Sequence, residues 1–294
     1  MTTWFDDCAG DDCAGIATPL AEGVIVLVHA SVGYPLVQEW HIRRFEEIDS
    51  TNRWLLDAAR TSAARPSGDG PAGDGQGAPT GMVAVADHQS AGRGRLGRAW
   101  VAPPGASLLC SILLRPATLA VDRLHLLTAA VALAAADAVE AEAGFRPDLK
   151  WPNDLMVGRR KLAGVLAEAA LPVVVVGIGI NCNWPAVEEM PPELTNIAVA
   201  ANHIAGRPVS RDAVLTGMLA ALGVLLDEGW DKVASRYRRS CTTIGQIVRV
   251  DLADESFSGT AADITTEGHL LVDVGTCLRT VTAADVTHLR PEPP

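Results

Sequence analysis

The chain has 294 residues, 48% of them hydrophobic, and a formal net charge of −11 at pH 7. This length accommodates one large and one small domain, and the apolar content suffices for a sizeable core. The acidic balance argues against non-specific nucleic-acid binding, which needs a basic surface. The six cysteines show no zinc-ligand spacing, and no secretory signal with a basic start is present, so we expect a cytoplasmic protein without membrane association.

The N-terminal region differs in composition from the rest. Residues 6–15 repeat Asp-Asp-Cys-Ala-Gly twice, an acidic, low-complexity pattern. We therefore expect residues 1–43 to be disordered or weakly structured, although Val24–His29 could form a strand. The region is too short for a DNA-binding module with a linker and lacks a basic recognition helix, so we expect no DNA-binding domain. A catalytic domain should then span 44–240 and a C-terminal domain 241–294.

The chain-order pattern is mixed rather than a regular alternation of strand and helix. Ser50 or Thr51 caps a helix reaching about Ala64, and residues 65–81 read as a flexible loop rich in Gly, Pro and Asp. A long helix that is apolar almost all round is expected at Asp122–Ala143. Strands are expected at Met82–Ala86, Ser107–Leu114, Leu149–Trp151, Leu155–Val157, Leu162–Ala169 and Val173–Asn181, and helices at Val214–Leu226 and Asp231–Arg239. Short strands at Gln246–Leu252, Ser256–Thr265, Leu270–Val274 and Arg279–Val281 predict a small all-β unit.

Two stretches carry candidate chemistry. Lys150-Trp-Pro-Asn-Asp154 is followed by Arg160-Lys161-Leu-Ala-Gly164, and these contain two of the three lysines in the chain. A compact ammonium reaches a single oxygen in a tight site better than the planar guanidinium of arginine does. The loop Gly92-Arg-Gly-Arg-Leu-Gly-Arg98 alternates close-approach glycines with forked donors suited to phosphate or carboxylate.

These stretches, together with Asp49-Ser-Thr-Asn52, Gln89, Trp100 and Gly177-Ile-Gly-Ile-Asn181, resemble the biotin–protein ligases in content and order. The resemblance implies an α+β fold: a class II synthetase-like mixed sheet with flanking helices, plus a C-terminal SH3-like β-barrel. It implies ATP- and magnesium-dependent ligation of biotin, through biotinyl-5′-AMP, to a lysine of the biotin carboxyl carrier domains of acyl-CoA carboxylases. A lipoate or octanoate–protein ligase and a biotin-responsive transcriptional regulator are the alternatives, and a homodimer is left open.

The resemblance also assigns roles to particular residues. Lys161 and Arg95 are the expected catalytic residues, and Asp154 is the candidate magnesium ligand. The expected biotin-binding residues are Ser50, Thr51, Asn52, Gln89, Arg93, Gly94, Arg95 and Lys161. The expected nucleotide-binding residues are Arg93, Arg95, Arg98, Trp100, Asn153, Asp154 and Asn181, with Trp100 offering a face to adenine.

Overall fold

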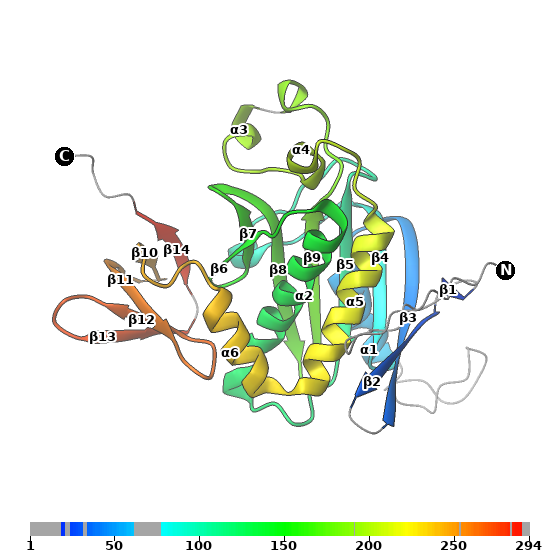
Figure 1. Ribbon diagram of the computed structural model, residues 1–294, viewed down its shortest axis with the longest axis horizontal. Helices are drawn as coiled ribbons and strands as arrows, with labels where there is room; N and C mark the ends of the chain where they lie inside the picture. Colours follow the sequence, from blue (N-terminus) through cyan, green and yellow to red (C-terminus); the bar gives the residue numbers. More distant parts are fainter. Residues whose placement is uncertain are drawn as a thin grey trace, which may run out of the picture.

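A large mixed sheet with helices on both faces and a smaller sheet beside it make up the molecule (Figure 1). The computed structural model describes residues 19–20, 24–31, 34–61, 78–190, 192–252, 254–282 and 284–289. The predicted α+β class is therefore confirmed.

The large sheet has nine strands and one parallel pairing. Its spatial order is β1 (Pro19–Leu20), β2 (Val24–Ser31), β3 (Tyr34–Ile48), β4 (Met82–Gln89), β5 (Ser107–Leu114), β9 (Val173–Asn181), β8 (Arg160–Ala170), β7 (Asp154–Val157) and β6 (Asp148–Lys150). β3 and β4 run parallel, and the other neighbours run antiparallel. The central strands β5 and β9 are buried at every position, as expected of continuous apolar runs covered on both faces.

The expectation of weak structure across residues 1–43 needs correction. β2 and most of β3 lie in that range, and β3 continues through the expected boundary at residue 44. Its residues from His41 to Ile48 pair with Met82 to Gln89 of β4, and Trp40 is completely buried. The repeat at 6–15 lies outside the described residues, as do the last residues of the predicted helix, 62–64, and residues 65–77 of the predicted loop.

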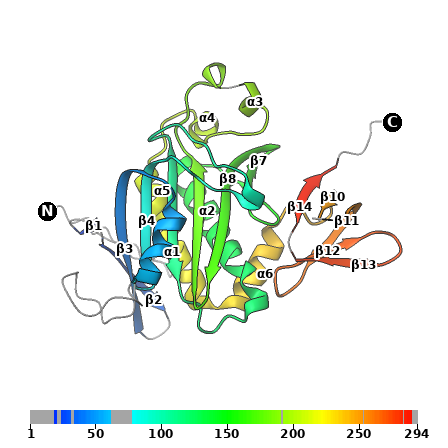
Figure 2. The same ribbon diagram turned by 180° about the vertical axis from the view of Figure 1, so that it is seen from behind.

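Three helices cover one face of the large sheet: α2 (His125–Ala143), α5 (Arg211–Glu228) and α6 (Trp230–Ser240) (Figure 1). α1 (Thr51–Thr61) lies on the opposite face (Figure 2). Shorter turns of helix, most of them not predicted from sequence, are η1 (Arg95–Gly97), η2 (Val121–Arg123), η3 (Val187–Glu189), α3 (Pro192–Thr195) and α4 (Ala201–Ala205).

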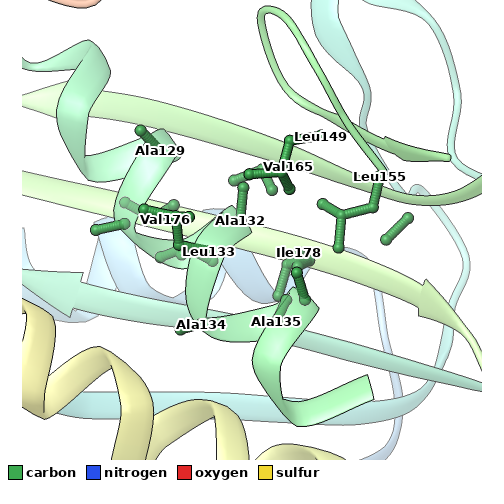
Figure 3. Packing of buried hydrophobic residues seen from close by; sticks show 14 of the residues in the cluster. Ala129, Ala132, Leu133, Ala134, Ala135, Leu149, Leu155, Val165, Val176 and Ile178 are labelled. Carbon is green, nitrogen blue, oxygen red and sulfur yellow. The ribbon is translucent and has the colours of Figure 1, made fainter. Parts of the chain in front are cut away.

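The alanine-rich helix α2 forms the centre of the core. With η2 it is long and apolar enough to cross a membrane by composition, but it packs inside the molecule against β8, β9 and α5. Small side chains such as Ala129, Ala132 and Ala135 let the helix approach Val165, Val176 and Ile178 of the sheet (Figure 3). Gly144, with φ of 78°, ends the helix in a left-handed cap.

The C-terminal segment forms a five-stranded antiparallel sheet. Its strands are β10 (Ile247–Asp251), β11 (Ser256–Ile264), β12 (Leu270–Asp273), β13 (Leu278–Val281) and β14 (Asp285–His288), in the spatial order β13-β12-β11-β10-β14. The sequence predicted the first four, but not β14. Among the described residues no pairing joins β13 to β14, so the antiparallel sheet is shown and the SH3-like barrel stays a prediction.

The Lys150–Asp154 stretch is where the two sheets join. Thr242 N–H donates to Leu149 O over 2.9 Å, and Trp151 N–H donates to Thr243 Oγ1 over 3.0 Å. The indole of Trp151, completely buried, donates to Gly268 O of the C-terminal sheet over 2.9 Å. The motif that carries the candidate chemistry is thus fixed by both sheets.

Candidate active site

The parallel pairing of β3 and β4 brings the first group of predicted residues together. The C-terminal ends of parallel strands lie side by side, and here Ile48 pairs with Gln89. α1 begins just beyond β3, so Thr51 faces the Gln89 side chain. The Thr51 N–H and hydroxyl reach Gln89 Oε1 at 2.8 Å and 3.0 Å. Thr51 and Gln89, 38 positions apart in the sequence, thereby form one hydrogen-bonded pair.

A buried hydrogen-bond network continues from this pair. Ser111 Oγ lies 2.6 Å from Thr51 Oγ1 and donates to Asn52 Oδ1 over 2.6 Å. Two hydroxyl protons serve three oxygen–oxygen contacts in this network, so one contact lacks a proton. A neutral polar ring that donates to these acceptor oxygens would add hydrogen bonds to the network.

Glycines of β8 and β9 form the floor beneath these side chains. A Cβ on Gly177 would lie 2.2 Å from Asn52 Oδ1, and one on Gly179 would lie 2.5 Å from Trp100 Cε2. Only glycine allows such close approach. The remaining space is a narrow cavity of about 30 Å³, lined by Ser50, Thr51, Asn52, Gln89, Arg93, Trp100 and the glycine floor.

Trp100 lies at the junction with a larger cavity. Its indole rests on Gly164 and Gly179, its Nε1 is buried without a hydrogen-bond partner, and Lys161 Nζ lies 5.5 Å from the ring centroid. The ring therefore borders both the narrow cavity and the larger one. Its predicted contact with adenine stays a prediction.

The larger cavity, of about 430 Å³, is strongly cationic. Five basic side chains line it, against two carboxylates, in a chain with an overall charge of −11. The basic residues are Arg93, Arg95, Arg98, Lys150 and Lys161, and the acidic ones are Asp154 and Asp285. Burial lowers the pKa of Arg95 and of Lys150, with Asp154 and Asp285 opposing the shift. A bound polyanion would offset this cost of desolvated positive charge.

Lys161 is held firmly in this cavity, which we call the cationic cavity. Its Nζ lies 2.6 Å from Asp154 Oδ1. Its backbone N–H donates to Ile197 O over 2.8 Å, and its carbonyl accepts from Val199 N–H over 3.0 Å. Asn181 Nδ2 also donates to Lys161 O, so part of its predicted nucleotide-binding capacity is used to position the lysine. Asn181 Oδ1 is buried without a partner.

The glycine–arginine loop is a tight hairpin that reaches the C-terminal sheet. Gly94 N–H donates to Arg98 O over 2.7 Å, and Leu96 at the tip has a left-handed φ of 56°. Arg95 Nη1 donates to Asn153 Oδ1 and to Ala284 O, each over 3.3 Å, and Arg98 pairs with Asp285. All the predicted site residues therefore lie around the two adjoining cavities.

Sequence reasoning missed three residues of this region: Ser111, Glu168 and Asp285. The sequence signal for Ser111 is a hydroxyl residue inside the apolar run of β5, and the structure shows that this residue is completely buried. Glu168 stands alone among alanines of β8, and Asp285 begins the strand that was not predicted. Their roles arise from pairing between distant strands, which no local pattern displays.

The residues present suit a magnesium ion that arrives with a nucleotide rather than a resident metal. Within the described ranges, no three His, Cys, Asp or Glu side chains converge on one point. Asp154 offers a single carboxylate and is already paired with Lys161. One carboxylate together with substrate phosphates is a usual environment for Mg²⁺.

Comparisons with known proteins agree with this geometry. Residues 75–184 match the Biotin/lipoate A/B protein ligase family, and residues 243–289 match the Biotin protein ligase C terminal domain. The biotin–[acetyl-CoA-carboxylase] ligase of Mycobacterium tuberculosis is 39% identical over 220 residues, covering 71% of this chain and 80% of that protein. The bifunctional ligase/repressor BirA of Bacillus subtilis is 31% identical over 218 residues, covering 71% of this chain and 66% of that protein.

Solved structures show the same fold. The biotin protein ligase from Aquifex aeolicus in complex with biotin and ATP is 26% identical, with a TM-score of 0.68 over 85% of this chain and 99% of that chain. The family resemblance read from the motifs is confirmed by these matches. The chain belongs to the biotin protein ligase family.

Proposed function

We propose that this protein joins biotin to a lysine of a biotin carboxyl carrier domain of an acyl-CoA carboxylase, with ATP as the energy source. The carrying observation is that a narrow polar cavity rich in hydroxyl and amide groups meets a cationic cavity at Trp100, beside Lys161. The polar groups of the first match the hydrogen-bonding groups of the ureido ring of biotin, and the basic side chains of the second match the triphosphate of ATP. Their junction is where the biotin carboxylate and the α-phosphate would meet.

The reaction follows from this arrangement in two steps. In the first, a carboxylate oxygen of biotin attacks the α-phosphorus, the bond to the β-phosphate oxygen breaks, and pyrophosphate leaves. In the second, an unprotonated lysine amine of the carrier attacks the acyl carbon, and AMP leaves. Neither step requires a nucleophile from this chain.

The residues act by charge and by position. Lys161 bridges the two negative groups, and Arg95 and Arg98 neutralise charge on the phosphates. A magnesium ion held by the nucleotide phosphates and Asp154 would supply further positive charge. The loop at Gly92–Arg98 covers the mixed anhydride and excludes water from it.

Two features favour biotin over lipoate or octanoate. The narrow cavity is lined by hydroxyl and amide groups at Thr51, Asn52, Gln89 and Ser111, which suit a polar ureido ring better than an alkyl chain or dithiolane ring. The C-terminal match is to biotin protein ligases in particular. A cytoplasmic location and the absence of DNA binding remain predictions.

Biotin-dependent exchange of labelled pyrophosphate into ATP tests the first step. We expect exchange with biotin and magnesium, and none with lipoate or octanoate in place of biotin. Transfer of labelled biotin to a carrier domain, but not to its lysine-to-arginine variant, tests the second step. Exchange driven by lipoate alone would contradict the proposal.

A further inference from the structure

Glu168 contacts two parts of the site at once. It lies on β8, on the same face of the sheet as Gly164 and Leu166, and its neighbours Ala167 and Ala169 are exposed. Its Oε2 accepts from Asn52 Nδ2 over 2.8 Å, and its Oε1 lies 3.0 Å from Arg93 Nη1. One carboxylate therefore joins the wall of the narrow cavity to the glycine–arginine loop.

The two partners differ in how firmly they are held. Asn52 is 4% exposed and has few alternatives, because its Oδ1 accepts from Ser111 and Leu166 O is the other acceptor for its Nδ2, at 3.2 Å. The Arg93 side chain is 53% exposed and belongs to a surface hairpin. Glu168, with a side chain 23% exposed, lies between a buried wall and an exposed hairpin.

Only a carboxylate can satisfy both partners. Each partner brings an N–H donor, and a carboxylate offers one oxygen to each. A glutamine offers a single oxygen, so one of the two contacts would face an NH₂ group. Glutamine at this position would thus separate the loop from the wall without a large change in side-chain volume.

We propose that Glu168 is a positioning residue that couples closure of the glycine–arginine loop to occupation of the narrow cavity. It fixes the orientation of the Asn52 amide and at the same time holds the loop at Arg93. A ring bound against Asn52 then stabilises the closed loop, and the closed loop retains the ring. This inference rests on the proposed biotin ligase function and adds a residue to it.

The coupling makes a prediction that a purely structural role does not make. Loss of the link should speed the escape of biotinyl-adenylate from the enzyme by about tenfold, the effect of one charge-assisted hydrogen bond. The maximal rate of pyrophosphate–ATP exchange at saturating biotin and ATP should change by less than about twofold, since Lys161, Arg95 and Arg98 are untouched. A destabilised site would instead lose maximal rate, affinity and melting temperature together.

The test compares Glu168→Gln with Glu142→Gln as a matched control. The Glu142 side chain is 25% exposed and pairs with Arg207 over 3.5 Å, outside both cavities. The readouts are the adenylate escape rate, the exchange rate and amide exchange across residues 90–100 with biotin and ATP bound. We expect faster escape and faster amide exchange in Glu168→Gln alone.

Arg93→Gln removes the same link from its exposed side and keeps the test valid if Glu168→Gln folds poorly. Because Arg93 also lines both cavities, the double variant is compared with Arg93→Gln, and it should release the adenylate no faster than that single variant. Unchanged escape in Glu168→Gln, tighter retention, or additive effects in the double variant would overturn the inference. A wild-type enzyme that forms no adenylate would instead overturn the proposed function.

Discussion

At the scale of single residues, the two cavities differ in how readily the sequence reveals them. The cationic cavity is visible because its arginines and lysines occur in short motifs. The narrow cavity depends on Ser111 and Glu168, each a single polar residue in a strand. Their hydrogen bonds with Thr51 and Asn52 span 59 to 116 positions, and only strand pairing brings these residues together.

Lys161→Arg should lower the rate of adenylate formation about a hundred- to thousandfold, equivalent to roughly 3–4 kcal/mol of lost charge stabilisation. A Cβ added to Gly164 would lie 2.8 Å from Lys161 Cε and Nζ, so the end of the lysine side chain fits closely against this glycine. The Trp100 ring lies on another side of the ammonium group. A flat guanidinium has no comparable room. Biotin-dependent pyrophosphate–ATP exchange measures the loss, and the melting temperature should barely change.

Arg160→Ala is the control for this experiment. Successive side chains of a strand point to opposite faces, so Arg160 cannot replace its neighbour. A near-normal exchange rate in Lys161→Arg, or a larger loss in Arg160→Ala, would show that the lysine has been assigned the wrong role.

Gly177→Ala should weaken biotin binding about tenfold to a hundredfold while the protein stays folded. The new Cβ would overlap Asn52 Oδ1 at 2.2 Å, and Asn52 cannot withdraw because Ser111 and Glu168 hold its amide. Titration calorimetry with biotin measures the effect. Gly217→Ala in α5 is the control, since its Cβ would meet Ala138 at an ordinary 3.4 Å. Equal biotin affinity in Gly177→Ala and the wild type would contradict the geometry.

At the scale of elements, the sequence was most informative where apolar runs are continuous. The predicted bounds of β5 and β9 match the structure, because buried central strands need apolar residues at every position. β14 was missed because Val286 is the one apolar residue among its four, and α3 and α4 were missed because four or five residues are too few to show a helical period. The parallel partner of β4 was also misjudged: most of β3 lies in the region expected to be weakly structured.

The junction between α2 and the C-terminal sheet predicts a dependence of stability on pH. His125 begins α2 and packs near Trp151 and Tyr237, with its Nε2 buried and unpartnered. Burial, with the charge of Arg95 and the neighbouring His269, lowers the pKa of His125 to about 4. In the unfolded chain the histidine has a pKa near 6.5. As the pH falls from about 6.5 to 4, the unfolded chain therefore binds a proton at this position while His125 of the folded chain stays neutral.

Stability should therefore fall on acidification, with a contribution from His125 of about 2 kcal/mol between pH 7.5 and pH 5. Urea unfolding at the two pH values measures this difference. In His125→Gln the pH-dependent difference should shrink by about that amount, whatever the change in absolute stability. An identical pH dependence in the variant would mean that His125 does not remain neutral in the folded protein.

At the scale of the whole molecule, the site belongs to both sheets. Arg95 and Arg98 of the loop contact Ala284 and Asp285, and Trp151 is fixed from the C-terminal sheet by Thr243 and Gly268. The sequence indicated a separate C-terminal unit from its change of pattern near residue 241. It could not indicate that this unit completes the wall of the cationic cavity, because that contact involves residues more than a hundred positions apart.

The N-terminal region offers a test of where the folded domain begins. Deletion of residues 1–18, which contain the tandem repeat, should leave stability and adenylate formation unchanged. Deletion of residues 1–43 should be damaging, because it removes Trp40 from the core and leaves only Arg44–Ile48 of β3 to pair with β4. Loss of a buried tryptophan alone costs about 3–5 kcal/mol. At roughly 2–4 °C per kcal/mol for a protein of this size, the melting temperature should fall by about 10 °C.

Thermal unfolding and pyrophosphate–ATP exchange of both deletions, beside full-length Trp40→Ala, separate the contributions. Trp40→Ala should reproduce most of the loss seen in the longer deletion, since the tryptophan is its main buried side chain among those described. If the protein beginning at Arg44 has the same melting temperature and the same exchange rate as the full-length chain, then β3 before residue 44 does not contribute to the folded core. The large sheet would then be complete from Arg44 onward, as the composition alone had suggested.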